Sequence, residues 1–521
     1  MFRSPFGDVE IPDVPFTSFV LERAEAHRDK PALVDATSGS TLTHGDLVDG
    51  VRRVAASLAR RGFGKGDVLS LYLPNVPEYA IAFHAVASLG GIVHPANPLL
   101  TAKELCFQLS DSRARFLVTV PALVEKAREA AAGSQVEDVF VIGERSFAEL
   151  LETDDEPPEV AVDPDDVVAL PYSSGTTGFS KGVMLTHRNL VANLCQIEPH
   201  LMVGEEEVAL GVLPFFHIYG LIVVLNYALR QAATVVTMPR FDFEGVLGAI
   251  QERGITHAFV VPPIVLALAR QPAVERYELS SLDFVMSGAA PLSPELEQEC
   301  AERLGCLFRQ GYGLTEASPV THMVPHTPGW ERPGSVGPPI PNSEVVLVDP
   351  GSAEPVEPGR PGEVWVRGPH VMKGYLGNPA ATSLTIDADG WLHTGDIGVA
   401  EEDGYLTVVD RLKELIKVKA YQVAPAELEA LLLTHPAIAD AAVVPSPDEE
   451  AGEVPKAYVV LCGECEVDEI VAFVAERVAP YKRIRRCEVV KEIPKSPSGK
   501  ILRRVLVERE RAPRAGQTQR V

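Results

Sequence analysis

The stretch that decides the fold is Tyr172-Ser-Ser-Gly-Thr-Thr-Gly-Phe-Ser-Lys-Gly-Val-Met-Leu-Thr-His187. Five Ser and Thr side chains, two glycines and a lysine fall within residues 172–181, directly after an apolar segment at 167–171 that predicts a strand. Glycine lets the backbone adopt positive φ and approach a ligand closely, and turned backbone N–H groups form an anion nest. Lys181 adds a positive charge for a phosphate, and an apolar helix start is expected after it. The spacing is not that of GxxxxGK[ST], but the stretch predicts a phosphate-binding loop rather than a flexible surface loop.

The segments on both sides of this loop alternate between helical and strand patterns. Such alternation predicts βα units with largely parallel sheets, and beyond residue 362 shorter alternating segments predict a β-rich part. The predicted helices are 46–61, 425–433 and 466–478. The predicted strands are 67–73, 115–120, 233–238, 257–261, 283–287, 363–367, 405–410, 441–444 and 457–461.

With 521 residues the chain is too long for one compact core, so at least two domains are expected. The fold class is predicted to be α/β, with a large N-terminal domain of βα units and mixed sheets at 1–410. A hinge at 411–413 and a small, mobile α+β C-terminal domain at 414–521 complete the predicted organisation.

The composition is that of an ordinary soluble globular protein, with 46% hydrophobic and 23% charged residues. The net charge of −25 argues against nucleic acid as a partner, because its phosphates demand a basic surface. Seven scattered cysteines are typical of reduced thiols. No apolar run of signal-peptide or membrane-spanning length is found, and the expected location is the cytoplasm.

The loop resembles the signature of the adenylate-forming superfamily, which includes acyl-CoA synthetases, luciferases and adenylation domains. Gln310-Gly-Tyr-Gly-Leu-Thr-Glu316 and Pro494-Lys-Ser-Pro-Ser-Gly-Lys500 resemble two further motifs of that superfamily. Other segments that match in the family order are 214–220, 285–291, 362–368, 390–396 and 410–411. The resemblance covers nearly the whole chain and implies an ATP-dependent acid–CoA ligase that works through an acyl-adenylate.

The resemblance also implies roles for individual residues. Lys500, Glu316 and His217 would be catalytic, with Lys500 on a mobile arm, and Thr176 and Glu316 would hold Mg²⁺. The positions implied for ATP or AMP are Ser173, Ser174, Gly175, Thr176, Thr177, Lys181, Gln310, Gly311, Thr315, Asp396, Arg411, Lys413, Lys417, Gln422 and Lys500.

The resemblance implies that coenzyme A reacts in a second arrangement of the same site. In the superfamily the C-terminal domain rotates about a hinge next to the Asp-Arg pair, which is Lys413 here. The rotation withdraws Lys500 and brings in the segment 417–422. Arg240, Lys419 and Ala420 match coenzyme A positions, although glycine is usual at the last of these. Many members have proline at Ser180.

Within the superfamily, the chain is most similar to 4-coumarate:CoA ligases and their bacterial relatives. The implied acyl-binding positions are His217, Tyr219, Val223, Met286, Ala289, Gly311, Gly313, Pro319, Val320 and Met323. They describe an apolar slot in which glycines leave room for an aromatic ring. Because plant enzymes tend to place a small or hydroxyl residue at Val223, the valine favours cinnamate or another apolar acid over 4-coumarate.

Three alternatives stay open. A medium- or long-chain fatty acyl-CoA synthetase would share the motifs, while an amino-acid adenylating enzyme would need a carboxylate in the pocket. A non-catalytic scaffold would have no reason to keep Lys500, Asp396, Arg411 and Glu316 together. The pair Cys462-Gly-Glu-Cys465 is interpreted as a turn rather than a zinc site. The expected oligomeric state is a monomer or homodimer.

Overall fold

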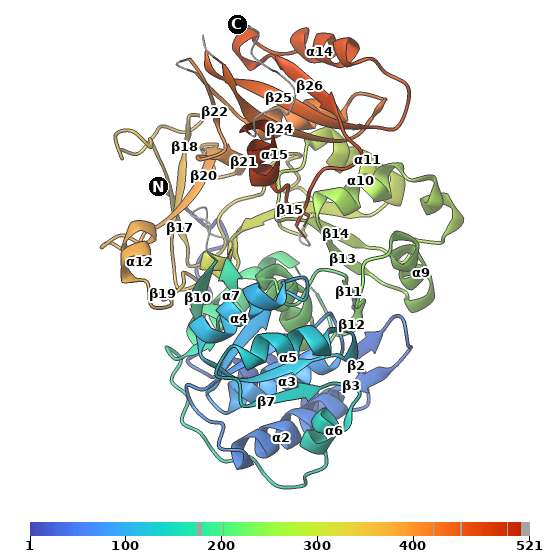
Figure 1. Ribbon diagram of the computed structural model, residues 1–521, viewed down its shortest axis with the longest axis vertical. Coiled ribbons are helices and arrows are strands. Elements are labelled where there is room, and N and C mark those ends of the chain that lie inside the picture. Colours follow the sequence, from blue (N-terminus) through green and yellow to red (C-terminus); the bar gives the residue numbers. More distant parts are fainter. Residues whose placement is uncertain (174–179, 202, 420, 449–450, 497–498, 512–521) are drawn as a thin grey trace, which may run out of the picture.

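The structure is a computed structural model that describes residues 1–173, 180–201, 203–419, 421–448, 451–496 and 499–511. Within these residues, three sheets build the large N-terminal part, and a fourth sheet builds a smaller C-terminal part that lies above it (Figure 1). The predicted α/β class with a small C-terminal unit is confirmed. The predicted phosphate-binding loop falls mostly outside the described residues, and Ser173, Ser180 and Lys181 mark its described ends.

The first mixed sheet has the strand order β19-β10-β8-β5-β4-β6-β7, with β9 beside β10. Strands β4 to β8 pair in parallel, while β10 runs antiparallel to β8, β9 and β19. The bounds are β4 (Val68–Tyr72), β5 (Ile92–Ala96), β6 (Ala114–Thr119), β7 (Asp138–Val141), β8 (Val167–Ala169), β9 (Tyr172–Ser173), β10 (Lys181–Thr186) and β19 (Gly374–Tyr375).

The second mixed sheet has the order β16-β15-β14-β13-β11-β12-β2-β3, and its two outermost strands, β3 and β16, are antiparallel. Its inner strands pair in parallel. The bounds are β2 (Pro31–Asp35), β3 (Thr41–Thr43), β11 (Val208–Gly211), β12 (Thr234–Thr237), β13 (His257–Val260), β14 (Phe284–Ser287), β15 (Leu307–Gly313) and β16 (Val320–Met323).

The third sheet is antiparallel, and the fourth forms the C-terminal part. The third comprises β1 (Phe2–Arg3), β17 (Glu344–Val348), β18 (Pro361–Arg367), β20 (Leu392–Ala400) and β21 (Leu406–Arg411). The fourth comprises β22 (Ile416–Val418), β23 (Tyr421–Val423), β24 (Ile438–Asp448), β25 (Gly452–Leu461) and β26 (Arg486–Val489). Because β21 ends at Arg411 and β22 begins at Ile416, four residues connect the two parts.

Helices cover both mixed sheets, which share one hydrophobic core. Nearly every side chain of helix α3 (Glu78–Ser88) and of the π-helix Tyr219–Asn226 is buried, as expected for helices inside a core. The described helices are α1 (Phe16–Val20), α2 (His44–Arg60), α3 (Glu78–Ser88), α4 (Ala102–Ser112), α5 (Val124–Ala132), α6 (Arg145–Leu151), α7 (His187–Leu201), α8 (Tyr227–Arg230), α9 (Phe243–Arg253), α10 (Pro262–Arg270), α11 (Pro294–Leu304), α12 (Pro379–Thr385), α13 (Pro425–Leu433), α14 (Val467–Ala475) and α15 (Arg503–Arg511).

Most predicted elements are confirmed to within a few residues, and α13 matches its predicted bounds. Helix α2 begins where Thr43 and Asp46 form a reciprocal capping box. One expectation is wrong. The segment directly after the loop is not the start of a helix but strand β10, and helix α7 begins only at His187. The segment 181–186 is short, contains Val183 and Leu185 as buried residues, and pairs with β8, which decides for a strand.

Candidate active site

A pair of opposite charges, of which only the carboxylate is buried, lies between two strands of the third sheet. Asp396 on β20 stands directly opposite Arg411 on β21, and its Oδ1 atom lies 3.0 Å from the Arg411 Nε atom. The other carboxylate oxygen accepts a hydrogen bond of 2.6 Å from the Tyr312 hydroxyl. Asp396 is only 4% exposed, and its charge raises the pKa of Arg411. The carboxylate is therefore held rigidly by a cation and a hydroxyl donor.

Glu316 occupies a short 3₁₀ turn, Thr315–Ala317, at the end of β15. Its Oε1 atom accepts hydrogen bonds from the Ser173 hydroxyl at 3.1 Å and from the Tyr375 hydroxyl at 2.9 Å. The Lys181 ammonium group lies 4.7 Å from the centre of the Tyr375 ring. Both described ends of the hydroxyl-rich loop therefore converge on Glu316 and Tyr375.

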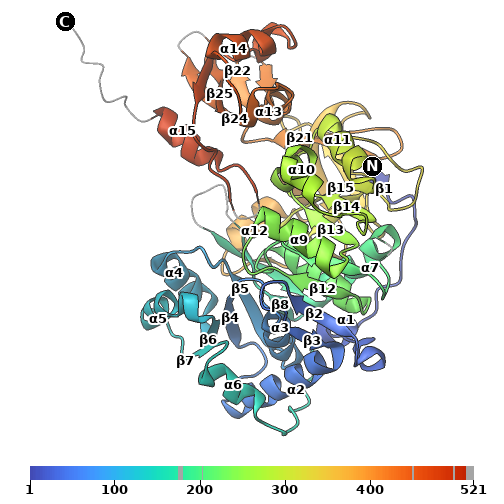
Figure 2. The same ribbon diagram turned by 90° about the vertical axis from the view of Figure 1, so that its right-hand side faces the viewer.

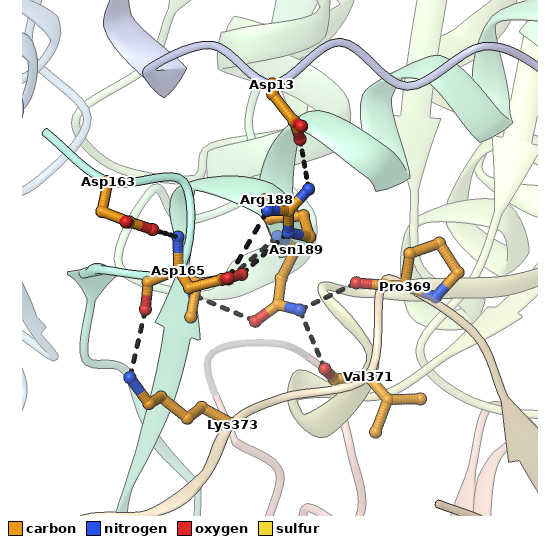
Figure 3. A network of polar contacts seen from close by, with 9 residues as sticks. Asp13, Asp163, Asp165, Arg188, Asn189, Pro369, Val371 and Lys373 are labelled. Carbon is orange, nitrogen blue, oxygen red and sulfur yellow. Dashed lines mark hydrogen bonds and ion pairs between the residues drawn. The ribbon is translucent and has the colours of Figure 1, made fainter.

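A polar network behind this loop fixes the segment that carries Tyr375 (Figure 3). Asn189, at the start of α7, donates to the carbonyl oxygens of Pro369 and Val371 at 2.8 and 2.9 Å. Lys373 donates to the carbonyl oxygen of Asp165 at 3.1 Å. The Glu316 carbonyl accepts from the backbone of Met372 as well. These contacts hold the segment 369–375 beside the residues that flank the loop. Tyr375 therefore lies within reach of Glu316.

Lys500 reaches this site from the C-terminal part. Burial and then the neighbouring charge of Arg411 lower the pKa of Lys500, while the carboxylates of Asp396 and Glu316 raise it. Burial and then the Lys500 charge lower the pKa of His217 to about 3, so this imidazole is neutral near pH 7. The Lys500 ammonium group therefore lies within electrostatic range of Arg411, Asp396 and Glu316. A Cβ atom added to the preceding residue, Gly499, would lie 3.0 Å from Val261 Cγ2, which places the lysine-bearing limb against the end of β13.

The predicted acyl pocket gathers side chains from the π-helix and from β14, β15 and β16. The Tyr219 hydroxyl donates to the Met286 carbonyl oxygen at 3.3 Å. A Cβ atom added at Gly311 would lie 3.7 Å from the Met286 sulfur and 4.0 Å from Met323 Cγ. Val223 is fully buried, and Met286 and Met323 are each 1% exposed. The side chains around this position are uncharged.

The two predicted pocket glycines differ, and the expectation that both leave room for a ring is wrong for Gly313. A Cβ atom at Gly313 would lie 2.2 Å from the Pro319 carbonyl oxygen, whereas one at Gly311 would lie 3.5 Å or more from its neighbours. Gly313 is therefore required by the close approach of the backbone at Pro319, and only Gly311 opens toward the pocket.

Replacing these glycines with alanine should separate the two roles. Gly313→Ala is expected to destabilise the fold by about 3 kcal/mol, because overpacking against backbone cannot relax. Gly311→Ala should leave the melting temperature nearly unchanged and raise KM for a bulky acid. Thermal unfolding and acid kinetics of the two variants check this difference. Equal melting temperatures for both variants would contradict it.

Gln310 does not point into the site. Its amide group donates a 2.7 Å hydrogen bond to the Glu297 carboxylate on α11, and the side chain is only 3% exposed. Neighbours in a strand face opposite sides, so the approach of Gly311 to the pocket turns Gln310 away from it. A nucleotide contact by Gln310 would have to come from its backbone. Thr315 lies beside Glu316, as expected.

Two of the residues predicted for the second arrangement lie on the C-terminal sheet. Lys417 and Gln422 face each other on β22 and β23, and the Lys417 backbone N–H donates to Glu453 at 3.0 Å. Lys413 and Lys419 are exposed, and Arg240 is exposed after β12. Ala420, like Ser174, Gly175, Thr176 and Thr177, lies outside the described residues. In this structure Lys500 is near Arg411 and Asp396, while Lys417 and Gln422 are paired with each other on the C-terminal sheet.

Sequence reasoning missed two tyrosines of this site. Tyr312 lies inside the quoted 310–316 motif and supplies the hydroxyl that bonds Asp396. Tyr375 lies at the end of the first sheet and bonds Glu316. Position within a motif could have indicated Tyr312, but Tyr375 reaches the site only through the pairing of β19 with β10.

Two family profiles match the chain. Residues 20–376 match the AMP-binding enzyme family, and residues 427–500 match the AMP-binding enzyme C-terminal domain. The chain is 44% identical to 4-coumarate–CoA ligase 2 of Oryza sativa subsp. japonica, over 97% of this chain and 94% of that protein. It is 45% identical to 4-coumarate–CoA ligase 2 of Petroselinum crispum, over 97% and 96%.

Solved structures resemble the chain over almost its full length. An anthranilate CoA ligase in complex with anthranoyl-AMP superposes with a TM-score of 0.89 at 27% identity, covering 96% of this chain and 98% of that one. An o-succinylbenzoate CoA synthetase from Bacillus subtilis, in complex with its acyl-adenylate intermediate, gives a TM-score of 0.83 at 30% identity, covering 98% and 100%. In the part of the chain that is described, no helix is long and apolar enough to cross a membrane.

Proposed function

This chain belongs to the AMP-binding enzyme family, and from that premise we propose that it joins a flat aryl acid of the cinnamate and 4-coumarate type to coenzyme A. The enzyme is an acid–CoA ligase that activates a carboxylate with ATP as an acyl-adenylate and then transfers the acyl group to the thiol of coenzyme A. The assignment is carried by the Asp396–Arg411 pair, held by Tyr312, together with Glu316 at the end of the hydroxyl-rich loop.

The first step is attack of the acid's carboxylate on the α-phosphate of ATP, which expels pyrophosphate. Two anions must be brought together, and charge moves onto phosphate oxygens, so a fixed cation lowers the barrier. Lys500 is proposed to lie between the carboxylate and the α-phosphate. Asp396 would accept hydrogen bonds from the ribose hydroxyls, since Arg411 and Tyr312 hold its carboxylate in one orientation.

Magnesium fits the residues that are present. Mg²⁺ in nucleotide sites is typically held by one or two carboxylates together with substrate phosphates. The Glu316 carboxylate lies beside Ser173 at the loop end, and Thr176 belongs to the part of the loop outside the described residues. Glu316 and Thr176 are proposed to hold the ion. Once bound, Mg²⁺ would neutralise charge on the departing pyrophosphate.

The second step is proposed to use a rotated C-terminal domain. The hydrophobic core of the C-terminal part begins at Ile416, which supports a boundary between 1–410 and 414–521 with the hinge at 411–413. In the described arrangement Lys500 serves adenylation. Rotation at Lys413 would withdraw Lys500 and bring Lys417 and Gln422 to the adenylate. Arg240, Lys419 and Ala420 would then bind coenzyme A.

An aryl acid is favoured by the uncharged slot around Gly311, with Tyr219, Met286 and Met323 on its sides. An amino acid would need a carboxylate partner for its ammonium group, which these side chains do not provide. A medium- or long-chain fatty acid remains the second candidate, because the slot is apolar throughout. Cytoplasmic location and a monomeric or homodimeric state stay predictions.

A panel of acids tests the substrate class. Cinnamate, 4-coumarate, benzoate, octanoate and palmitate would each be supplied with ATP and coenzyme A, and the thioester formed would be quantified. The proposal expects cinnamate-type acids to have the highest kcat/KM. Higher values for octanoate or palmitate would assign the enzyme to fatty acids instead.

Val223 should determine how strongly the enzyme discriminates between acids with and without a hydroxyl group on the ring. Its buried side chain cannot accept or donate a hydrogen bond, and an unpaired buried hydroxyl costs about 1–3 kcal/mol. We therefore expect kcat/KM for cinnamate to be at least equal to that for 4-coumarate. Val223→Ser should shift the ratio toward 4-coumarate by about tenfold, which is about 1.4 kcal/mol.

The control is Val224→Ser, because Val224 is also fully buried in the same π-helix but is not a predicted pocket residue. Its ratio of the two acids should stay that of the unchanged enzyme. A tenfold preference of the unchanged enzyme for 4-coumarate would mean that another residue already bonds the hydroxyl.

A further inference from the structure

The loop that carries Lys500 is closed at its base. The backbone N–H of Leu502 donates to the Pro494 carbonyl at 2.8 Å, and that of Ser496 donates to the Lys500 carbonyl at 2.8 Å. Lys495 and Ile501 form a bridge between these two contacts. The two limbs of this loop are therefore paired up to Ser496 and Lys500, while the expected mobility of the arm stays a prediction.

Ion pairs flank this base on both sides. Before the loop, the Lys495 ammonium group lies 2.7 and 2.9 Å from the two carboxylate oxygens of Asp440 on β24. After the loop, the Arg503 guanidinium donates to Glu414 at 2.7 Å and to Glu429 at 2.6 Å. Each limb of the loop is thus attached to the C-terminal part by a charged side chain.

The Arg503 contacts join three separate segments. Arg503 is the first residue of α15 and comes three residues after Lys500. Glu414 directly follows the proposed hinge, and its backbone N–H donates to the Arg411 carbonyl at 2.9 Å. Glu429 lies on α13 and also accepts from the Val443 backbone at 2.7 Å. The guanidinium therefore connects the lysine-bearing limb with the strand that carries Arg411.

The pairing is well enclosed. The side chain of Arg503 is 15% exposed and that of Glu429 is 10% exposed. A planar guanidinium can donate to two carboxylates from separate nitrogens, whereas a lysine ammonium acts as a point charge. Burial raises the pKa of Glu429 to about 7, against the lowering effect of Arg503. Without the arginine, Glu429 can take up a proton, which limits the cost of a buried charge.

The far end of α15 is fastened as well. Glu510, seven residues after Arg503 and on the same face, accepts from Lys456 at 2.6 Å and from the Ser446 hydroxyl at 2.7 Å. Helix α15 packs beside β24, and Figure 2 shows it at the outer edge of the C-terminal part. Anchors two turns apart fix the direction of the helix axis, and hence the start of the lysine-bearing limb.

We propose that Arg503 is a positioning residue for adenylation. By holding the Lys500 loop to Glu414 and Glu429, Arg503 fixes how far the Lys500 side chain extends into the site. The proposal rests on the adenylating role of Lys500 in the proposed function. The C-terminal domain then delivers Lys500 to the site by way of these contacts. Misplacement of a reacting group by about 1 Å can cost on the order of 100-fold in rate, so the attachment matters for the chemistry.

The test compares Arg503→Met with Arg504→Met in the full chain. Arg504 is the adjacent arginine of the same helix, with a side chain that is 74% exposed. Arg503→Met should slow single-turnover adenylate formation by about 10- to 100-fold. Transfer of the acyl group from supplied acyl-adenylate to coenzyme A should be unchanged. Arg504→Met should leave both half-reactions unchanged, and Arg503→Lys should restore part of the adenylation rate.

Arg503→Met alone could fail to fold, because it leaves two carboxylates without their partner. A triple variant that adds Glu414→Gln and Glu429→Gln removes the ion pairs without leaving an unpaired charge. It should fold and adenylate slowly. Normal adenylation by either folded variant, or an equal fall of both half-reactions, would overturn the proposal. If Lys500→Ala itself adenylates normally, the proposed role of Lys500 fails instead, which separates the two outcomes.

Discussion

Replacing Lys500 with alanine is expected to slow adenylate formation by about 10²- to 10³-fold, the usual effect of removing one preorganised charge from a transition state. The charges of Arg411, Asp396 and Glu316 all act on the lysine, which is proposed to contact the substrate carboxylate and the α-phosphate. Transfer from supplied acyl-adenylate to coenzyme A should stay nearly intact, since Lys500 is expected to be withdrawn for that step. Single-turnover pyrophosphate release and thioester formation measure the two half-reactions separately.

The matched control is Lys491→Ala, an exposed lysine nine residues earlier in the same C-terminal part. It should leave both half-reactions unchanged. An equal fall of both half-reactions in Lys500→Ala would contradict a role limited to the first step and, with it, the two-arrangement interpretation.

Replacing Asp396 with alanine is expected to raise KM for ATP by about 10- to 100-fold, because hydrogen bonds to a charged group contribute about 1.5–3 kcal/mol. The change removes the proposed ribose acceptor and also leaves Arg411 without its 3.0 Å partner and Tyr312 without its 2.6 Å acceptor. Initial rates at varied ATP, with acid and coenzyme A saturating, measure the effect.

Asp389→Ala is the control for this change, because Asp389 is exposed and lies seven residues earlier in the chain. It should leave KM for ATP unchanged. If Asp396→Ala keeps the KM for ATP of the unchanged enzyme, Asp396 does not bind the ribose, and its pairing with Arg411 is structural only.

Local patterns predicted much of the fold, because they depend on short-range periodicity. The helix predicted at 425–433 begins with a proline, a residue favoured at the first helical position, and α13 has these bounds. The strand predicted at 441–444 is shorter than β24, which runs from Ile438 to Asp448. The additional residues pair with β25, and sequence periodicity holds no information about that pairing. Strand β10 was mistaken for the start of a helix for the same reason, since its partner β8 decides its conformation.

The candidate site was predicted where a motif supplies the whole contact and missed where the contact comes from a distant segment. Asp396 and Arg411 were identified from motifs, and the pairing of β20 with β21 places them opposite each other. Gln310 was assigned to the nucleotide, but its partner Glu297 could be found only from the packing of α11. Arg503 belongs to none of the quoted motifs, and its partners Glu414 and Glu429 can be found only from the fold.

The most direct test of the central claim is acid-dependent exchange of labelled pyrophosphate into ATP in the complete absence of coenzyme A. If the enzyme forms an acyl-adenylate before coenzyme A takes part, cinnamate should support exchange without coenzyme A, and the thioester should appear only after coenzyme A is added. Exchange that requires coenzyme A would contradict the adenylate mechanism. Exchange with fatty acids but not with cinnamate-type acids would contradict the proposed substrate class.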